Sequence, residues 1–215
     1  MITIFSKGSL LLFLTFSFGT TIFGQATDKR PVFNELCGAE GWKLAFKDSG
    51  TRKWQQRWSL DGLRATVVNT PRGMVFSAGP HERDDACHGV LWTKQSFSGD
   101  LKVSYTYTRT DTREKWVNIL YLFATGAGER PKDIMAWRED RIIPSMRTYF
   151  NQMNAVHISY AAISRDSTGE LGDYIRARIY PVPEGKRFKS TAIAPDYFNS
   201  ELFEPGVPYR ITTIK

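Results

Sequence analysis

Short runs of alternating or continuous apolar residues recur along the chain, and each is bounded by Gly, Pro, Asn or Asp. Runs of this length and spacing are typical of β-strands joined by turns. They predict strands at residues 64–69, 73–79, 88–94, 100–109, 116–126, 155–164, 174–182 and 209–215. The pattern favours an all-β fold, an antiparallel β-sandwich or jelly roll, over a helical domain.

Two segments depart from simple alternation. Residues 116–126, WVNILYLFATG, are apolar on both faces and predict a central strand that is buried on both sides. Residues 131–146, PKDIMAWREDRIIPSM, predict a short helix that starts after Pro131 and ends before Pro144, because proline interrupts helical backbone. The chain has no linker or internal repeat, so residues 27–215 are expected to form a single domain.

The last apolar run, 209–215, continues to the final residue, where a sandwich of this type adds at least one further strand. An open strand edge invites pairing with other chains. We therefore expect a domain that is truncated at its C-terminus and lacks its last strand or strands.

The first 26 residues, MITIFSKGSLLLFLTFSFGTTIFGQA, have the organisation of an export signal. Lys7 precedes an apolar run, and small residues occur at Gly24 and Ala26, where a signal peptidase would cut. An uncleaved membrane anchor is the alternative, but polar residues interrupt the run before the roughly 20 apolar positions that a span needs. We expect cleavage near Ala26, export to the periplasm or the extracellular space, and no stable membrane insertion afterwards.

Export limits the binding partners that the composition suggests. Cleavage removes one of the 29 Lys and Arg and none of the 22 Asp and Glu, so the net charge falls from +7 to +6. The cations are dispersed, without the basic block of a nucleic-acid-binding arm, so we expect no nucleic-acid partner. An acidic polysaccharide suits a basic exported protein better, and general solubility is the alternative explanation.

Two cysteines, Cys37 and Cys87, are compatible either with one disulfide in an oxidising compartment or with two buried free thiols. Neither has the spacing of a zinc site, and the Asp and His residues between positions 81 and 88 match no strong metal signature. We therefore predict no metal site and no cofactor.

Polar side chains concentrate in residues 149–160, YFNQMNAVHISY. Strand alternation places His157 and Tyr160 on opposite faces, so these two form an acid–base pair only if a bulge reorients one of them. Tyr149, on the loop expected before this strand, has more freedom to reach a cleft. A structural hydrogen-bonding role for His157 is the alternative.

The run 174–182, YIRARIYPV, alternates between two faces. The apolar face, expected to lie in the core, carries Ile175, Ala177 and Ile179. The other face carries Tyr174, Arg176, Arg178 and Tyr180. Aromatic planes stack on sugar rings and guanidinium groups bind carboxylates through paired hydrogen bonds, so this face can hold an acidic polysaccharide. An ordinary solvated strand face is the alternative.

A second histidine, His88, shares strand parity with Trp92 in the run 88–94. A sandwich builds a site from groups on neighbouring strands, so His88 is a candidate cleft residue near His157. No strand carries two carboxylates at glycosidase spacing, and no G-x-S-x-G, P-loop or dinucleotide motif occurs. Hydrolysis by paired carboxylates is therefore not supported, although carboxylates from separate strands could converge.

The combination of HGVLWTKQSFSGDLKVSYTYTR, NILYLFATG, WREDR and YFNQMNAVHISYAA resembles a family of exported bacterial proteins of unknown function. That family falls in the concanavalin A-like (laminin-G-like) lectin/glucanase superfamily. The resemblance covers residues 37–215, and YFNQMNAVHISYAA is its more specific part. It implies a curved sandwich whose concave sheet faces a carbohydrate in polysaccharide degradation, but it supplies no established catalytic residue.

These observations predict an exported β-sandwich that binds and cleaves an acidic polysaccharide by lyase chemistry. In this scheme an arginine neutralises the uronate carboxylate, His157 or His88 abstracts the C5 proton, and Tyr149 protonates the leaving oxygen. The substrate-binding candidates are Arg176, Arg178, Tyr174, Tyr180, Arg141, Asn151, Asn154 and Trp92. A non-catalytic glycan-binding module is the alternative, and a glycoside hydrolase with carboxylates from separate strands is a weaker one.

Overall fold

The structure is a computed structural model that describes residues 1–7, 29–112, 117–165 and 168–215. Its contacts divide the chain into two compact units, each assembled from separate stretches of sequence. Unit 1 comprises Met1–Asp48, Phe97–Thr106 and Arg210–Lys215, and unit 2 comprises Ser49–Ser96 and Tyr107–Tyr209. The prediction of a single sandwich domain therefore stays a prediction, and each unit is described by itself.

Unit 1 is built on a four-stranded sheet with the order β12-β7-β1-β2. Its elements are β1 (Ile2–Lys7), helix α1 (Arg30–Gly38), β2 (Lys43–Asp48), β7 (Asp100–Thr108) and β12 (Pro208–Ile214). Apolar side chains on three of these strands are buried, among them Ile4, Phe46, Leu101 and Val103. β1 falls within the predicted export signal, whose apolar run lies outside the described residues, so cleavage stays a prediction.

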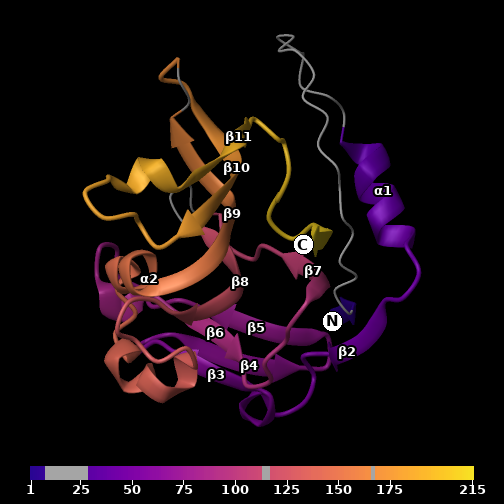
Figure 1. The fold of residues 1–215 in the computed structure, drawn as a ribbon, viewed down its shortest axis with the longest axis horizontal. Coiled ribbons are helices and arrows are strands. Elements are labelled where there is room, and N and C mark those ends of the chain that lie inside the picture. Colours follow the sequence, from indigo (N-terminus) through magenta and orange to yellow (C-terminus); the bar gives the residue numbers. More distant parts are fainter. Residues whose placement is uncertain (8–28, 113–116, 166–167) are drawn as a thin grey trace. The chain divides into compact units, whose positions relative to one another are not determined.

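Unit 2 contains a second four-stranded sheet with the order β11-β10-β9-β8 (Figure 1). Its strands are β8 (Asn118–Gly126), β9 (Met153–Arg165), β10 (Leu171–Tyr180) and β11 (Ala192–Phe198), all paired antiparallel. Two smaller antiparallel sheets pair β3 (Trp58–Asp61) with β6 (Val90–Thr93) and β4 (Thr66–Thr70) with β5 (Gly73–Ser77).

Short helical turns occupy the connections of unit 2. They are α2 (Met146–Gln152) and the 3-10 turns η1 (Trp54–Gln56), η2 (Asp85–Cys87), η3 (Ile134–Arg141) and η4 (Phe188–Thr191). The core joins β6, η3, α2 and β9 through Trp92, Ile134, Trp137, Tyr149 and Met153. Burial of these large side chains stabilises turns that are too short to persist by helical propensity alone.

Bulges interrupt the pairing on both sides of β9. The register with β8 shifts around Phe123, which has φ of 57°, and the register with β10 shifts opposite Ala161, which has φ of 50°. Positive φ in a non-glycine residue marks the local distortion that accompanies an inserted residue. Between the bulges, residues 155–159 pair regularly with residues 176–180, and this regular stretch holds the candidate site.

All eight predicted runs contain a strand, although Trp116, the first residue of the run 116–126, lies outside the described residues. The pattern missed β1, β2, β3 and β11. β3 has only four residues, and β11 contains Pro195, which argues against a strand except at the end of a sheet, where β11 lies.

One further expectation was wrong, and another was confirmed only in part. The run 116–126 was predicted to be a central strand, but β8 lies at the end of its sheet, and its apolar residues are mostly half-buried. The helix predicted between Pro131 and Pro144 is the 3-10 turn η3, which breaks at Trp137. At this break the Trp137 indole is buried, and its Nε1 donates to the Pro131 carbonyl at 3.2 Å.

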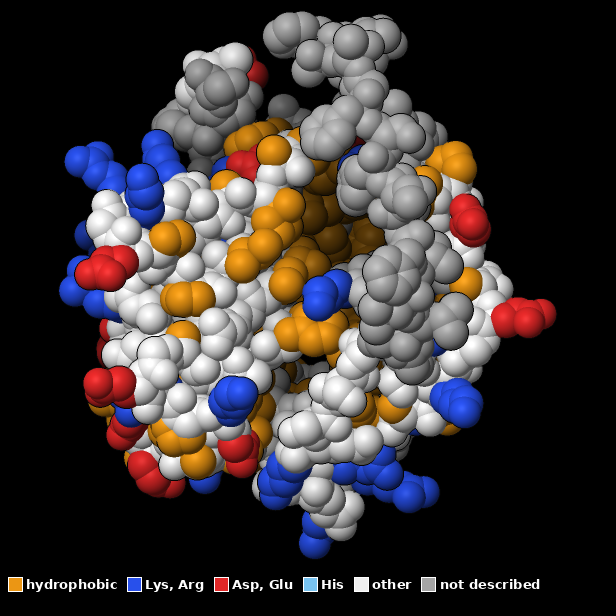
Figure 2. Space-filling model, viewed as in Figure 1, with side chains coloured by type: hydrophobic (Ala, Val, Ile, Leu, Met, Phe, Trp, Pro, Cys, Tyr) orange, Lys and Arg blue, Asp and Glu red, His pale blue; other side chains and the backbone are white. Residues whose placement is uncertain are grey.

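The chain is therefore mostly β, with its strands in several antiparallel sheets. Cys37 and Cys87 are both free thiols, and Cys87 is the buried one. Within the described ranges, no helix combines the length and the apolar character that crossing a membrane requires. On the face drawn in Figure 2, Lys and Arg side chains are dispersed and acidic side chains lie among them.

Candidate functional site

The regular stretch of β8, β9 and β10 brings six side chains to one face of the sheet. Arg178 and Tyr121 both lie directly opposite His157, from β10 and β8 respectively, and Arg176 lies opposite Ser159. Directly opposite residues of antiparallel strands point to the same side. We call this surface the polar face, and its members are Tyr121, His157, Ser159, Arg176, Arg178 and Tyr180.

Burial on this sheet is the reverse of the expectation from β10. Ile179, on the apolar face predicted to be core, is 57% exposed, whereas Arg178 is 8% and Tyr180 5% exposed. The reason is a cover formed by neighbouring segments: the Phe150 ring of α2 lies 6.3 Å from the Tyr180 ring, and Phe188 of η4 lies over Arg178. The polar face is therefore a covered surface.

His157 stands at the centre of the polar face, between two tyrosines. Its ring centroid lies 5.2 Å from that of Tyr180 and 5.6 Å from that of Tyr121. Burial, followed by the nearby Arg178, lowers the pKa of His157 to about 4, so the imidazole is neutral at pH 7. Its Nδ1 is buried and has no hydrogen-bond partner. The face thus presents an uncharged ring with a free nitrogen.

Tyr180 stays protonated beside this imidazole. Burial raises the pKa of Tyr180 to about 12, although the Arg178 guanidinium opposes part of the increase. Burial also raises the pKa of Tyr121 well above its usual value. Both phenols therefore stay protonated at neutral pH and can donate a hydrogen bond.

Arg178 is the buried cation of the polar face. Its Nη1 donates to the Thr191 hydroxyl at 3.3 Å and to the Phe188 carbonyl oxygen at 3.5 Å, and both acceptors are neutral. Within the described residues no ion pair involves Arg178, whereas Arg176 pairs with Asp196 at 2.6 Å. Burial, and then repulsion from Arg176, lowers the pKa of Arg178. The Asp196 carboxylate, which pairs with Arg176, opposes part of this decrease from a distance. A buried charge without a direct ion pair is costly, and an anionic ligand would lower that cost.

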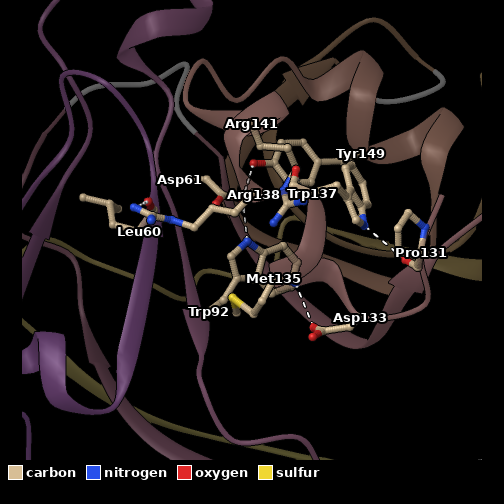
Figure 3. Close-up of polar contacts among 10 residues, drawn as sticks. All are labelled: Leu60, Asp61, Trp92, Pro131, Asp133, Met135, Trp137, Arg138, Arg141 and Tyr149. Carbon is tan, nitrogen blue, oxygen red and sulfur yellow. Dashed lines mark hydrogen bonds and ion pairs between the residues drawn. The ribbon is translucent and has the colours of Figure 1, made fainter.

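A second polar cluster is centred on Asp61, the last residue of β3, and is drawn in Figure 3. One carboxylate oxygen, Oδ2, accepts hydrogen bonds from Trp92 Nε1 and Arg141 Nε, both at 2.7 Å, and from the Tyr149 hydroxyl at 2.9 Å. We call these four residues the Asp61 cluster. All are buried, and the Asp61 and Arg141 side chains are 0% exposed.

The Asp61 cluster is enclosed on the side of η3. The Arg141 guanidinium lies 4.2 Å from the centre of the Trp137 ring, and its Nη1 donates to the Trp137 carbonyl at 3.1 Å. Asp61 Oδ1 and Arg141 Nη2 remain without partners. A fully buried ion pair with three converging donors fixes the structure around it.

Three predicted site residues belong to the Asp61 cluster and not to the polar face. Tyr149 was expected on a loop with freedom to reach a cleft, but it lies in α2, is 0% exposed, and donates its hydroxyl proton to Asp61. Burial, and then the adjacent carboxylate, raises its pKa strongly. Arg141 and Trp92 are likewise committed to Asp61, so the structure offers none of the three to a substrate.

Stacked rings connect the two clusters. Tyr121 of the polar face stacks on Trp92 at 5.6 Å and on Tyr149 at 5.8 Å, both measured between ring centroids. Offset aromatic stacking of this kind adds to the energy of burial. The Trp92 and Tyr149 rings of the Asp61 cluster therefore pack directly against Tyr121 of the polar face.

The other predicted residues are distributed around these clusters. The Arg176 guanidinium lies 4.4 Å from the centre of the Tyr174 ring, so Tyr174 extends the polar face along β10. His88 Nδ1 is 3.0 Å from the Pro144 carbonyl oxygen, and no described contact joins it to His157. Asn151 is exposed on α2, and Asn154 donates to Thr125 and to the Gly126 carbonyl. His88, Asn151 and Asn154 thus lie apart from the polar face.

Sequence reasoning missed Asp61, Tyr121, Phe188 and Thr191. Asp61 is the last residue of a strand that is too short to predict. Tyr121 lies in a run that is apolar on both faces, so the pattern did not distinguish it from core residues. Phe188 and Thr191 follow β10 in a stretch without strand or helix periodicity. Only the tertiary contacts reveal the roles of these four residues.

Comparison with protein-family models, curated proteins and solved structures finds no match for this chain. Within the part of the chain that the structure describes, no three His, Cys, Asp or Glu side chains are grouped so that they could hold a metal ion. The functional argument therefore depends on the two clusters.

The lowered pKa of His157 predicts a pH dependence of stability. Its ordinary pKa is about 6.5 and the folded value is about 4, so between these values the unfolded chain binds a proton that the native chain does not. The stabilisation is complete above pH ~6.5 and is lost as the pH falls toward 4. We expect the wild type to lose about 3 kcal/mol more than His157→Gln between pH 7 and pH 4 in urea unfolding. The matched control His88→Gln keeps the extra loss, and equal losses in wild type and His157→Gln would contradict the assignment.

The Asp61 cluster predicts large losses of unfolding free energy. Asp61→Ala leaves the Arg141 charge buried and unpaired and should cost roughly 3–5 kcal/mol. Tyr149→Phe removes one hydrogen bond to a charged group and should cost roughly 1.5–3 kcal/mol. Asp140→Ala is the control, because Asp140 pairs with Arg130 at the surface and its loss should cost less than about 1 kcal/mol. Equal effects of Asp61→Ala and Asp140→Ala in denaturant titrations would refute a structural role for the cluster.

Proposed function

We propose that the protein is an exported β-sandwich that binds an acidic polysaccharide on the polar face and cleaves it by β-elimination. The observation that carries this proposal is the buried Arg178, which has only neutral hydrogen-bond partners, beside the neutral imidazole of His157 with its free Nδ1. A uronate carboxylate would supply the missing negative charge. We include a concanavalin-like sandwich in the proposal because the antiparallel sheets are compatible with a β-sandwich.

The elimination uses three groups of the polar face. Arg178, with Arg176, binds the carboxylate and stabilises the negative charge that develops when the C5 proton leaves. His157 Nδ1 takes that proton, and the electron pair of the C5–H bond forms the C4–C5 double bond as the C4–O bond breaks. Tyr180 gives its proton to the departing glycosidic oxygen and later recovers one from the imidazolium.

Contacts in the structure support two details of this scheme. Tyr180 replaces Tyr149 as the proton donor, because the Tyr149 hydroxyl is bound to Asp61 whereas the Tyr180 ring lies beside His157. The bound carboxylate also offsets the Arg178 charge, which contributes to the low pKa of His157. Substrate binding would therefore raise the pKa of His157 and make it a stronger base.

A non-catalytic glycan-binding protein is the second candidate. The observation that favours it is that the rings of His157 and Tyr180 pack against each other, with 36° between their planes, and do not face across an open space. In that case the two arginines bind the carboxylates and no bond is broken. The described residues give the hydrolase alternative no support, because the Asp196 carboxylate, which contacts the polar face, is paired with Arg176.

The test is an elimination assay with the purified chain and a panel of uronate polysaccharides, following the ultraviolet absorbance of the unsaturated product. We expect activity that falls roughly 100-fold or more in His157→Ala and in Tyr180→Phe, the usual effect of losing a general base or acid. His88→Ala, a histidine outside the polar face, is the matched control and should retain activity.

The same panel separates the two candidates. Binding that is lost in Arg178→Met, without product from any polymer, would establish the glycan-binding alternative. Activity or binding that Arg178→Met and His157→Ala leave unchanged would show that the polar face is not the site.

A further inference from the structure

The connection between β10 and β11 covers the polar face. We call residues 181–191 the strap; its helical turn η4 is drawn in gold in Figure 1. The Phe188 ring lies 4.4 Å from the Arg178 guanidinium, and its centroid is 6.2 Å from Tyr180 and 4.9 Å from Phe150 of α2. The strap therefore covers the part of the polar face on which Arg178 and Tyr180 lie.

The strap also occupies Nη1 of the Arg178 guanidinium. Thr191, which is 4% exposed, accepts from Arg178 Nη1 and donates to the Phe188 carbonyl oxygen at 2.7 Å. A substrate carboxylate that bound the guanidinium through Nη1 would have to replace this hydroxyl and this carbonyl. The cover and the ligand would thus compete for one group.

The competition favours a carboxylate. The distances from Arg178 to Thr191 and Phe188, 3.3 and 3.5 Å, are at the long end of hydrogen-bond geometry. Guanidinium–carboxylate bonds are shorter, about 2.7–2.9 Å, and roughly twice as strong as bonds between neutral groups. A uronate can therefore displace the strap, whereas a neutral sugar gains little over the contacts already present.

The strap is anchored mainly at its two ends. At the start, Val182 N donates to the Phe150 carbonyl at 2.8 Å, and at the end Thr191 is held by Arg178. Between these anchors the described backbone bonds are local turns, Lys186 to Pro183 and Ser190 to Arg187. Release of Thr191 and Phe188 would free the segment from the sheet without breaking a strand pair.

The charge of the strap fits the same ligand. Its exposed side chains include the cations Lys186, Arg187 and Lys189 and a single acid, Glu184. A basic surface raises the local concentration of an anionic chain and speeds its arrival. An acidic polysaccharide would meet these cations before it reaches Arg178.

We propose that the strap is an autoinhibitory cover that an acidic polysaccharide displaces when its carboxylate takes the place of Thr191 and Phe188 on Arg178. The inference rests on the proposed function, since it assigns a gating contact to the same site. The strap would make access to Arg178 depend on the negative charge of the substrate.

The experiment compares binding of two probes, an oligogalacturonate and an oligoguluronate, by wild type, Thr191→Val and Thr191→Ser, using calorimetry and rapid-mixing fluorescence. Thr191→Val removes the hydroxyl that holds Arg178, and Thr191→Ser keeps it. We expect Thr191→Val to bind roughly fivefold more tightly than Thr191→Ser, since one competing hydrogen bond is lost. In wild type the observed association rate should reach a plateau with probe concentration, set by strap opening, and the plateau should be higher in Thr191→Val.

A second variant, Phe188→Ala, removes the ring over Arg178 and should raise the plateau without requiring a change at Thr191. Arg178→Met distinguishes the two proposals, with the exposed Arg187→Met as the control for lost charge. Binding that is lost in Arg178→Met but equal in Thr191→Val, Thr191→Ser and Phe188→Ala would overturn the strap and leave the site. Binding unaffected by Arg178→Met, or absent in wild type and in Thr191→Val, would overturn both.

Discussion

The carboxylate of Asp61 is the constraint on which unit 2 depends. One oxygen accepts donors from residues 31, 80 and 88 positions further along the chain, and no water is needed to satisfy those three donors. Removing a carboxylate from water is unfavourable, and each of the three donors offsets part of that cost. The short turns η3 and α2 therefore have defined positions, and the rings of Trp92 and Tyr149 form a fixed platform. Tyr121 stacks on these two rings, and the Tyr121 ring in turn contacts the His157 imidazole.

The sheet of unit 2 departs from the usual arrangement, in which the apolar face of a strand is buried and the polar face is wet. On β10 the Ile179 side chain is exposed, whereas its neighbours Arg178 and Tyr180 are buried. Proteins retain local conflicts of this kind mainly where a ligand or a reaction uses them. The conflict is concentrated at Arg178, where a buried charge has a hydroxyl and a carbonyl as its hydrogen-bond partners. The Asp61 carboxylate, by contrast, is paired directly with Arg141, which makes the polar face the better candidate for a ligand.

Strand positions could be predicted from the sequence because the two-residue period is local, and the parity of β10 correctly grouped Arg176 with Arg178 and Tyr180. The register that sets His157 opposite Arg178 could not be predicted, since it depends on bulges at Phe123 and Ala161 that have no sequence signature here. Tyr149 was misplaced for a different reason: its partner, Asp61, lies 88 residues away, and only tertiary packing brings them together. The face of β10 that is buried was predicted wrongly because its cover comes from the strap and α2, which hydrophobic periodicity does not describe.

Arg178 and Thr191 are only 13 positions apart, so the guanidinium and the groups that cover it belong to one hairpin. Loop segments tolerate insertions and substitutions that strands do not. The strength of the cover can therefore change through the length or composition of residues 181–191 while the pairing of β9 with β10 stays intact. If the proposed function holds, selectivity for ligand charge and the sheet that binds the ligand can therefore change separately, although a single stretch of chain encodes both.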